Sequence, residues 1–120
     1  MLINELSKRT GLSAHTIRFY EKSGLIEGKQ DDSVTSNNYF HYDEVSVEKL
    51  EFISDAKSVG FTIKEIGQII NAWYNNTYTK EQKLEILAEK LVSLEQKMKE
   101  IKEMKKRLLQ FKNDVLNDRC

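Results

Sequence analysis

Residues 12–26, LSAHTIRFYEKSGLI, contain a helix whose start is fully specified by the sequence. Ser13 is a typical N-cap, because its hydroxyl can accept a hydrogen bond from a free amide of the first turn. Leu12 and Ile17 occupy the two positions of a hydrophobic staple around that cap. The sequence therefore predicts a helix that begins at Ala14.

A shorter helix is predicted immediately before this one, in the stretch INELSKRTG. Its apolar residues Ile3 and Leu6 face inward, and Gly11 follows them. A glycine at that point can adopt the positive φ that a tight turn needs. A helix, a short glycine turn and a second helix form the pattern of a helix-turn-helix motif.

In such a motif the second helix lies in the major groove of DNA, and its N-terminal residues meet the base edges. If Ile17 faces the core, helical periodicity sets which side chains lie on the outer surface. An arginine on that surface can donate two hydrogen bonds to a guanine or a phosphate. The alternative is an ordinary solvated helix face that carries two cations. The candidate DNA contacts of this helix are His15, Thr16, Arg18 and Lys22.

The composition predicts a small, mainly helical protein. The chain has 120 residues, of which 32% are charged and 39% hydrophobic, and no apolar run is long enough to cross a membrane. It contains no proline, so little interrupts its helices. The N-terminus lacks the features of a signal peptide and Cys120 is the single cysteine, which favours the reducing cytoplasm.

The charge balance argues weakly against nucleic acid as a partner, because 19 basic side chains are matched by 19 acidic ones. The charges are unevenly distributed, however. Residues 1–30 contain five Lys and Arg against three Asp and Glu, whereas residues 31–78 contain three against eight. Any positive surface toward DNA must be local, and we expect an affinity that falls steeply with salt.

The middle of the chain predicts a hairpin and then a helix. Two short β-prone runs, 25–29 and 38–42, are separated by polar turn residues. This hairpin is too short to be stable alone and must pack on the helices, as the wing of a winged helix-turn-helix does. A helix is expected from its N-cap Asp43 to about Val59, with Gly60 ending it.

The next helix has an unusually explicit start. Thr62 and Glu65 have the spacing of a capping box, and Phe61 and Ile66 that of a hydrophobic staple. Lys64 lies in the first turn, where a cation opposes the helix dipole, so a nearby phosphate would explain it. A single lysine there is more often a solvated surface residue.

A second capping box, Thr79 with Gln82, begins a helix with no breaker for about 35 residues. Its apolar residues follow three- and four-residue steps, which is the heptad stripe of a coiled coil. At 1.5 Å per residue the helix is roughly 50 Å long, so a second copy of the chain is expected to bury the stripe. Packing back on its own domain is disfavoured by this length. The stripe consists of Leu84, Leu87, Leu91, Leu94, Met98, Ile101, Leu108 and Val115, interrupted by Lys105.

Three stretches together resemble the MerR family of bacterial transcription regulators: TIRFYEKSGLI, NNYFHY, and KSVGFTIKEIGQII followed by the long last helix. The resemblance covers essentially the whole chain. It implies a mostly α fold, in which residues 1–76 form a winged helix-turn-helix DNA-binding domain of four helices and a small β-hairpin wing. Residues 77–120 then form the coiled-coil dimerisation helix, paired antiparallel with that of a second copy.

The same resemblance implies how such a protein acts. It binds a pseudo-palindromic promoter as a homodimer and distorts the spacer DNA, so that RNA polymerase can use both promoter elements. The cost of that distortion depends on sequence and is offset by protein contacts. No cofactor is expected, and the effector cannot be read from the sequence.

Matched position by position, the resemblance implies DNA contacts by His15, Arg18 and Tyr20 in the recognition helix. It implies another by Lys64 at the start of the second-wing helix. Tyr20 and the wing residue Tyr39 could equally be buried aromatics of the core.

The wing departs from the family pattern. Tyr39 and Tyr42 match its aromatic residues, but Phe40 stands where an arginine is usual and Asn38 where a glycine is usual. A phosphate contact is therefore in doubt. The candidate substitutes for it are Lys29, Asn38 and His41.

The sequence offers little for signal sensing. Metal-sensing relatives use cysteine ligands, because thiolates select soft cations. This chain offers only Cys120, and its two histidines lie in the DNA-binding half, so a metal site is not expected. A small ligand would need a pocket near the aromatic residues 73, 74 and 78, which more often fill a hinge core.

Two other classes of protein remain open. An architectural DNA-bending factor of the excisionase type shares the winged fold but lacks the coiled coil. A protein-interaction adaptor would use the coiled coil alone and would not need Arg18 and Lys22 on a capped helix. An enzyme is not expected, because no nucleophile, carboxylate pair or phosphate loop has a suitable spacing.

Overall fold

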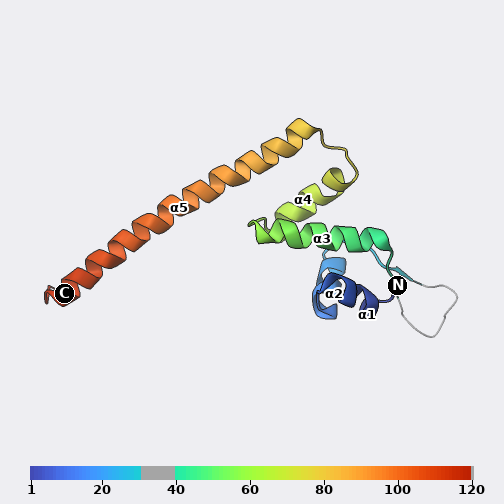
Figure 1. Cartoon of the computed structure of the whole chain (residues 1–120), viewed down its shortest axis with the longest axis horizontal. Coiled ribbons are helices and arrows are strands. Elements are labelled where there is room, and N and C mark those ends of the chain that lie inside the picture. The colour runs from blue at the N-terminus through green and yellow to red at the C-terminus, as the bar shows by residue number, and fades with distance from the viewer. Residues whose placement is uncertain (31–39, 120) are drawn as a thin grey trace. The chain divides into compact units, whose positions relative to one another are not determined.

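A computed structural model describes residues 1–30 and 40–119 of the chain. The chain divides into two units, Met1–Tyr78 and Thr79–Cys120, a boundary two residues after the one expected from the sequence. The mostly helical class is confirmed (Figure 1). The helices are α1 (Ile3–Thr10), α2 (Ala14–Lys22), α3 (Glu44–Ser58), α4 (Ile63–Tyr74) and α5 (Lys80–Leu116), and the strands are β1 (Lys29–Gln30) and β2 (Phe40–His41).

The helix-turn-helix has the predicted caps. Gly11 ends α1 with φ 74°, and its N–H donates to the carbonyl of Ser7. The hydroxyl oxygen of Ser13 accepts a hydrogen bond from the backbone N–H of Thr16 at 3.1 Å, so α2 begins at Ala14 as expected. These local bonds fix the turn between the two helices, because each satisfies a backbone group that the helix itself leaves free.

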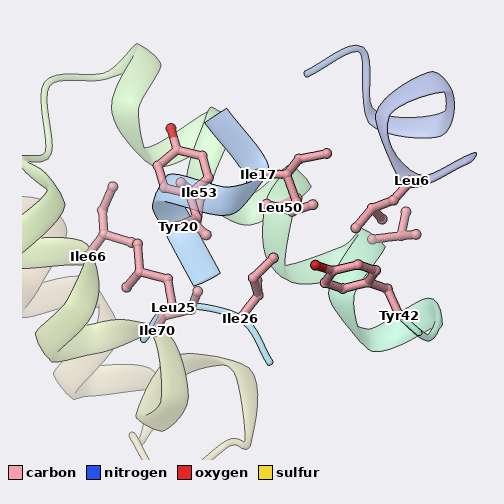
Figure 2. Close-up of a cluster of buried hydrophobic side chains, with 11 residues drawn as sticks. Leu6, Ile17, Tyr20, Leu25, Ile26, Tyr42, Leu50, Ile53, Ile66 and Ile70 are labelled. Atoms are coloured by element: carbon pink, nitrogen blue, oxygen red, sulfur yellow. The ribbon is translucent and has the colours of Figure 1, made fainter. Parts of the chain in front are cut away.

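One hydrophobic core holds the first unit together, and Figure 2 shows its side chains. Ile17 is 0% exposed within it, which confirms the inward direction that the staple predicted for α2. Because a helix turns 100° per residue, this burial sends the opposite face of α2 to solvent. The core consists of Leu6, Ile17, Tyr20, Leu25, Ile26, Tyr42, Val47, Leu50, Ile53, Ile66 and Ile70.

The hairpin is shorter than predicted. β1 and β2 pair antiparallel, with Lys29 opposite His41 and the next residue of β1 opposite Phe40. The expected strand over 25–29 is wrong for its first four residues. Leu25 and Ile26 are adjacent and both buried, which a strand with one face on the core cannot achieve, because its neighbouring side chains point to opposite faces. They lie in an irregular segment, and their side chains pack in the helical core.

The starts of α3 and α4 are as predicted. Asp43 caps α3 by accepting from the backbone N–H of Ser46 at 3.2 Å. At α4 both bonds of the capping box are present: Thr62 accepts from the N–H of Glu65 at 3.1 Å, and Glu65 accepts from the N–H of Thr62 at 3.0 Å. Phe61 packs against the core and Ile66 is fully buried, as the predicted staple requires.

The second unit is a single helix. Thr79 and Gln82 form both bonds of the second capping box, at 3.1 and 2.8 Å. α5 then runs for 37 residues, about 55 Å at 1.5 Å per residue. None of its residues is buried within the chain. No helix in the described parts of the chain combines the length and apolar character needed to cross a bilayer.

Candidate nucleic-acid interface

The outer face of α2 presents the predicted cationic surface. His15, Arg18 and Lys22 are exposed. Thr16 is half-buried, and its hydroxyl oxygen accepts a hydrogen bond from the hydroxyl of Ser13 at 2.9 Å. Arg18 and Lys22 are therefore the long, charged side chains that α2 can extend toward a ligand.

Phe19 is a further residue of this face, and it was not predicted from the sequence. Its side chain is 51% exposed, although large aromatic residues are usually covered. It follows His15 by four residues and so lies on nearly the same side of α2. Helical periodicity alone would have placed Phe19 on the outer face of α2. It was not singled out because large aromatic residues more often face the core.

Tyr20 belongs to the core rather than to the exposed face. Its side chain is only 3% exposed, and its ring lies 5.8 Å from that of Phe19. The Nζ atom of Lys57, from α3, lies 5.9 Å from the centre of the Tyr20 ring. Of the two roles that the sequence left open, burial favours the core one, and we remove Tyr20 from the proposed DNA contacts. The residues around Lys57 in the sequence do not predict that its side chain lies over the ring of Tyr20.

The wing is described only in part. Phe40 is 39% exposed, and Lys29 and His41 are exposed as well. Asn38 and Tyr39, two of the predicted wing contacts, lie outside the described residues.

Tyr42 is a buried anchor of the wing. Its hydroxyl donates a hydrogen bond to Oε2 of Glu21, and its backbone N–H donates to the carbonyl of Met1 at 2.7 Å. Burial first, and then the hydrogen bond to Glu21, raise the pKa of Tyr42 above its ordinary value. The sequence placed Tyr42 among the wing aromatics. In the structure its ring is buried, and its hydrogen bond to Glu21 joins the wing to α2.

The raised pKa of Tyr42 predicts a pH-dependent contribution to stability. The fold favours the protonated hydroxyl, so the contribution is complete below the unfolded pKa of about 10 and is lost as the pH rises above it. We expect Tyr42→Phe to lower the free energy of unfolding by about 1–3 kcal/mol at pH 8 and to flatten its decline above pH 10. Urea denaturation of both proteins at pH 8 and at several pH values above 10 measures the two effects. Parallel declines in the two proteins would contradict the assignment.

A hollow of about 510 Å³ lies where α2 meets the wing. It brings two of the predicted DNA contacts, both from α2, next to an exposed ring from β2. Lys64, which is exposed in the first turn of α4, is not among its residues. The lining residues are Arg18, Glu21, Lys22, Phe40 and Tyr42.

Gly28 allows the wing to approach α2 this closely. A Cβ atom at this position would lie 2.9 Å from Cβ of Phe40 and from Cε1 of Tyr42, and 3.1 Å from Oε1 of Glu21. These separations are below van der Waals contact, so any larger residue must displace at least one of these neighbours. Gly28 was not singled out from the sequence, because the contact joins segments far apart along the chain.

We expect Gly28→Ala to lower the free energy of unfolding by about 1–3 kcal/mol through this overpacking. The matched control is Gly67→Ala in α4, where the new Cβ would make ordinary contact with Leu25 at 3.5 Å. That substitution is expected to stabilise the protein by about 0.5–1 kcal/mol, because alanine is the better helix former. Thermal unfolding followed by circular dichroism distinguishes the two. A Gly28→Ala protein as stable as the wild type would show that the wing is not held against α2.

An ion pair partly neutralises one of the basic side chains of residues 1–30. Both terminal nitrogens of Arg9 donate to the carboxylate of Glu44, the second at 2.7 Å, which ties α1 to α3. The guanidinium of Arg9 lowers the pKa of the Glu44 carboxyl. The positive potential of residues 1–30 therefore depends chiefly on the other basic side chains.

The described residues offer no metal centre. Within 1–30 and 40–119, no three His, Cys, Asp or Glu side chains are grouped so that they could hold a metal ion. Cys120 lies outside the described residues.

Comparison with known families agrees with this geometry. Residues 1–73 match the MerR HTH family regulatory protein, and residues 47–111 match the MerR DNA-binding family. The chain belongs to the MerR family. The resemblance noted in the sequence is thereby confirmed, together with the winged helix-turn-helix fold that it implied.

Curated MerR relatives span nearly all of the chain. It is 31% identical over 108 residues to the HTH-type transcriptional regulator HmrR of Rhizobium leguminosarum bv. viciae, covering 90% of this chain and 81% of HmrR. It is 31% identical over 119 residues to the HTH-type transcriptional regulator CueR of Escherichia coli O6:H1, covering 98% of this chain and 85% of CueR. This MerR-family chain is thus similar along its length to transcription regulators.

Solved MerR structures share the fold. The transcription regulator PbrR691 from Ralstonia metallidurans CH34, solved in complex with lead(II), matches with a TM-score of 0.81 at 26% identity, over 95% of this chain and 87% of PbrR691. HiNmlR, a MerR family regulator lacking the sensor domain and bound to promoter DNA, matches with a TM-score of 0.61 at 21% identity, over 92% of this chain and 78% of HiNmlR. The second likeness concerns the fold alone.

Proposed function

We propose that this MerR-family regulator binds promoter DNA with α2 in the major groove. The observation that supports this most strongly is the orientation of α2: Ile17 is 0% exposed, while Arg18 and Lys22 on the outer face are free to reach a ligand. An α-helix fits the major groove, and arginine there can form two hydrogen bonds to guanine. The proposed contacts are His15, Thr16, Arg18, Lys22, Lys29, His41 and Lys64, and for Asn38 and Tyr39 the sequence alone supports a contact.

The protein acts as a homodimer in this proposal. The residues of the heptad stripe lie on a helix that buries none of them within its own chain, and most of them are exposed. Each such side chain contributes about 1.5–3 kcal/mol when fully buried, so the stripe supplies enough free energy for a stable dimer. A two-fold dimer presents two copies of α2 to two half-sites, and the operator should mirror that symmetry. The proposed dimer seam is Leu84, Leu87, Leu91, Leu94, Met98, Ile101 and Leu108.

The regulatory step follows from family membership. The dimer distorts the spacer between the two promoter elements, and RNA polymerase then uses both. Bending a site of 20–30 base pairs costs of the order of 1–6 kcal/mol, which the extra protein contacts must offset. This action takes place in the cytoplasm, where bacterial promoters are found.

Footprinting tests the proposal directly. The full chain is incubated with the intergenic DNA beside its own reading frame, at increasing salt. We expect protection of two half-sites related by a two-fold axis, hypersensitive bonds in the spacer between them, and an affinity that falls steeply with salt. Protection of a single asymmetric site would instead favour a DNA-bending factor of the excisionase type. Absence of protection at low salt would favour an adaptor that uses α5 alone.

A further inference from the structure

The exposed ring of Phe40 lies at the rim of the hollow between α2 and the wing. The two cations of that hollow, Arg18 and Lys22, come from α2, and Phe40 comes from β2. An aromatic ring that is 39% exposed gains free energy if a ligand covers it. The hollow thus combines positive charge with an apolar surface that its own chain leaves uncovered.

The direction of this ring follows from the residues that line the hollow. Phe40 and Tyr42 both line it, so the two side chains lie on the same side of this segment. Tyr42 is buried and bonded to Glu21, which anchors that side of the segment on α2. Phe40 must therefore face the hollow rather than the opposite surface of the wing.

The charge of the hollow suits one phosphate. Arg18 and Lys22 contribute two positive charges, and Glu21 contributes one negative charge while it accepts the hydrogen bond from Tyr42. The net charge of about +1 favours the negatively charged DNA backbone. With Arg18 assigned to a base, Lys22 is the cation of the hollow that can bind a phosphate. Beside each phosphate, the DNA backbone presents the apolar carbons of a deoxyribose, which a phenyl ring can cover.

We propose that Phe40 packs on a deoxyribose of the operator backbone, next to a phosphate bound by Lys22. This inference rests on the proposed DNA binding and adds to it a wing contact that is apolar instead of ionic. Such a contact strengthens binding without releasing counterions, so its contribution does not depend on salt.

Binding of the full-length dimer to its footprinted operator, measured at several salt concentrations, tests the inference. For Phe40→Ala we expect the affinity of the dimer to fall roughly 7- to 50-fold. In each of the two copies, the exposed 39% of the residue represents that share of a buried aromatic's transfer free energy. The slope of log affinity against log salt should stay unchanged. Phe40→Leu, which keeps an apolar side chain, should remain within about twofold of the wild type. For Phe40→Arg the slope should steepen by about 0.9 for each added phosphate contact.

Two controls separate the possible outcomes. Val92→Ala removes an exposed apolar side chain from α5 and should leave binding unchanged. Operator DNA with deoxyuridine in place of thymine lacks the base methyl groups, and the effect of Phe40→Ala should persist on it. Loss of the effect on that DNA would overturn the deoxyribose contact in favour of a thymine methyl contact.

Failure of this inference differs from failure of the proposed function. If the wild type binds its operator and folded Phe40→Ala binds equally well, the Phe40 contact is wrong and the DNA-binding role stands. A changed salt slope in Phe40→Ala would also overturn it, because the ring would then be affecting the phosphate contacts of Arg18 or Lys22 and not making an apolar contact of its own. If the wild type does not bind duplex DNA at low salt, the proposed function itself is wrong. Thermal unfolding of each variant shows whether it is folded.

Discussion

Substitution Arg18→Ala is expected to remove most specific promoter binding while leaving the protein folded and dimeric. The side chain is exposed on α2, so its loss leaves no cavity in the core. One good arginine contact to a base contributes about 1–3 kcal/mol of discrimination. Because a dimer uses the residue twice, the expected loss is about 2–6 kcal/mol, or at least roughly 30-fold in affinity. Electrophoretic mobility shift with the operator and with a scrambled duplex measures it.

Arg107→Ala is the matched control for this experiment. It removes an exposed side chain of the same type from α5, far along the sequence from α2. We expect its specific affinity to remain within about twofold of the wild type. Equal losses in the two variants would mean that Arg18 contributes only general positive charge. An Arg18→Ala protein that still prefers the operator would remove the recognition role of α2.

The second large effect is expected from Leu91→Asp, which should dissociate the dimer. Leu91 is 61% exposed within its own chain, so the substitution should cost little unless a second copy covers the site. Burial of an unpaired charge at an interface costs about 3–5 kcal/mol, and the lost leucine contacts add to this. Sedimentation equilibrium should show monomers at concentrations where the wild type is dimeric, and binding to the two half-sites should be lost.

The neighbouring residue provides a matched control for Leu91. Val92 is 65% exposed on the same helix, and one residue further on it lies about 100° around the helix axis from the stripe. Val92→Asp should therefore leave the protein dimeric and able to bind DNA. If both variants dissociate the dimer, the substitutions disrupt the helical structure of α5 in general. Dissociation by neither would mean that the heptad stripe is not the dimer interface.

The helix starts could be predicted from the sequence because their signals are local. Ser13, Thr62 and Thr79 each bond to an amide three residues later, so the pattern that predicts the cap also contains the atoms that form it. The inward direction of Ile17 followed from the same pattern. The outward direction of the face that carries Arg18 and Lys22 could therefore be predicted from the amino-acid sequence alone.

Features that depend on contacts between distant segments could not be predicted in this way. The first strand was placed too early, because the adjacent residues Leu25 and Ile26 are β-prone but are both needed by the helical core. Tyr42 was matched to the wing aromatics, but its bond to Glu21 joins segments 21 residues apart and could not be predicted from the local sequence. The close approach at Gly28 likewise needs the folded chain.

Because α5 buries no side chain within its own chain, the concentration of the protein can determine how much of it forms a dimer. The buried side chains of the core all belong to the first unit, so no second copy is needed to complete that core. If a second copy covers α5 as proposed, the assembled form grows with the square of the protein level at low abundance, and dilution favours separate chains. Expression level would then act as an input of its own, and promoter occupancy would rise more steeply than the amount of protein made.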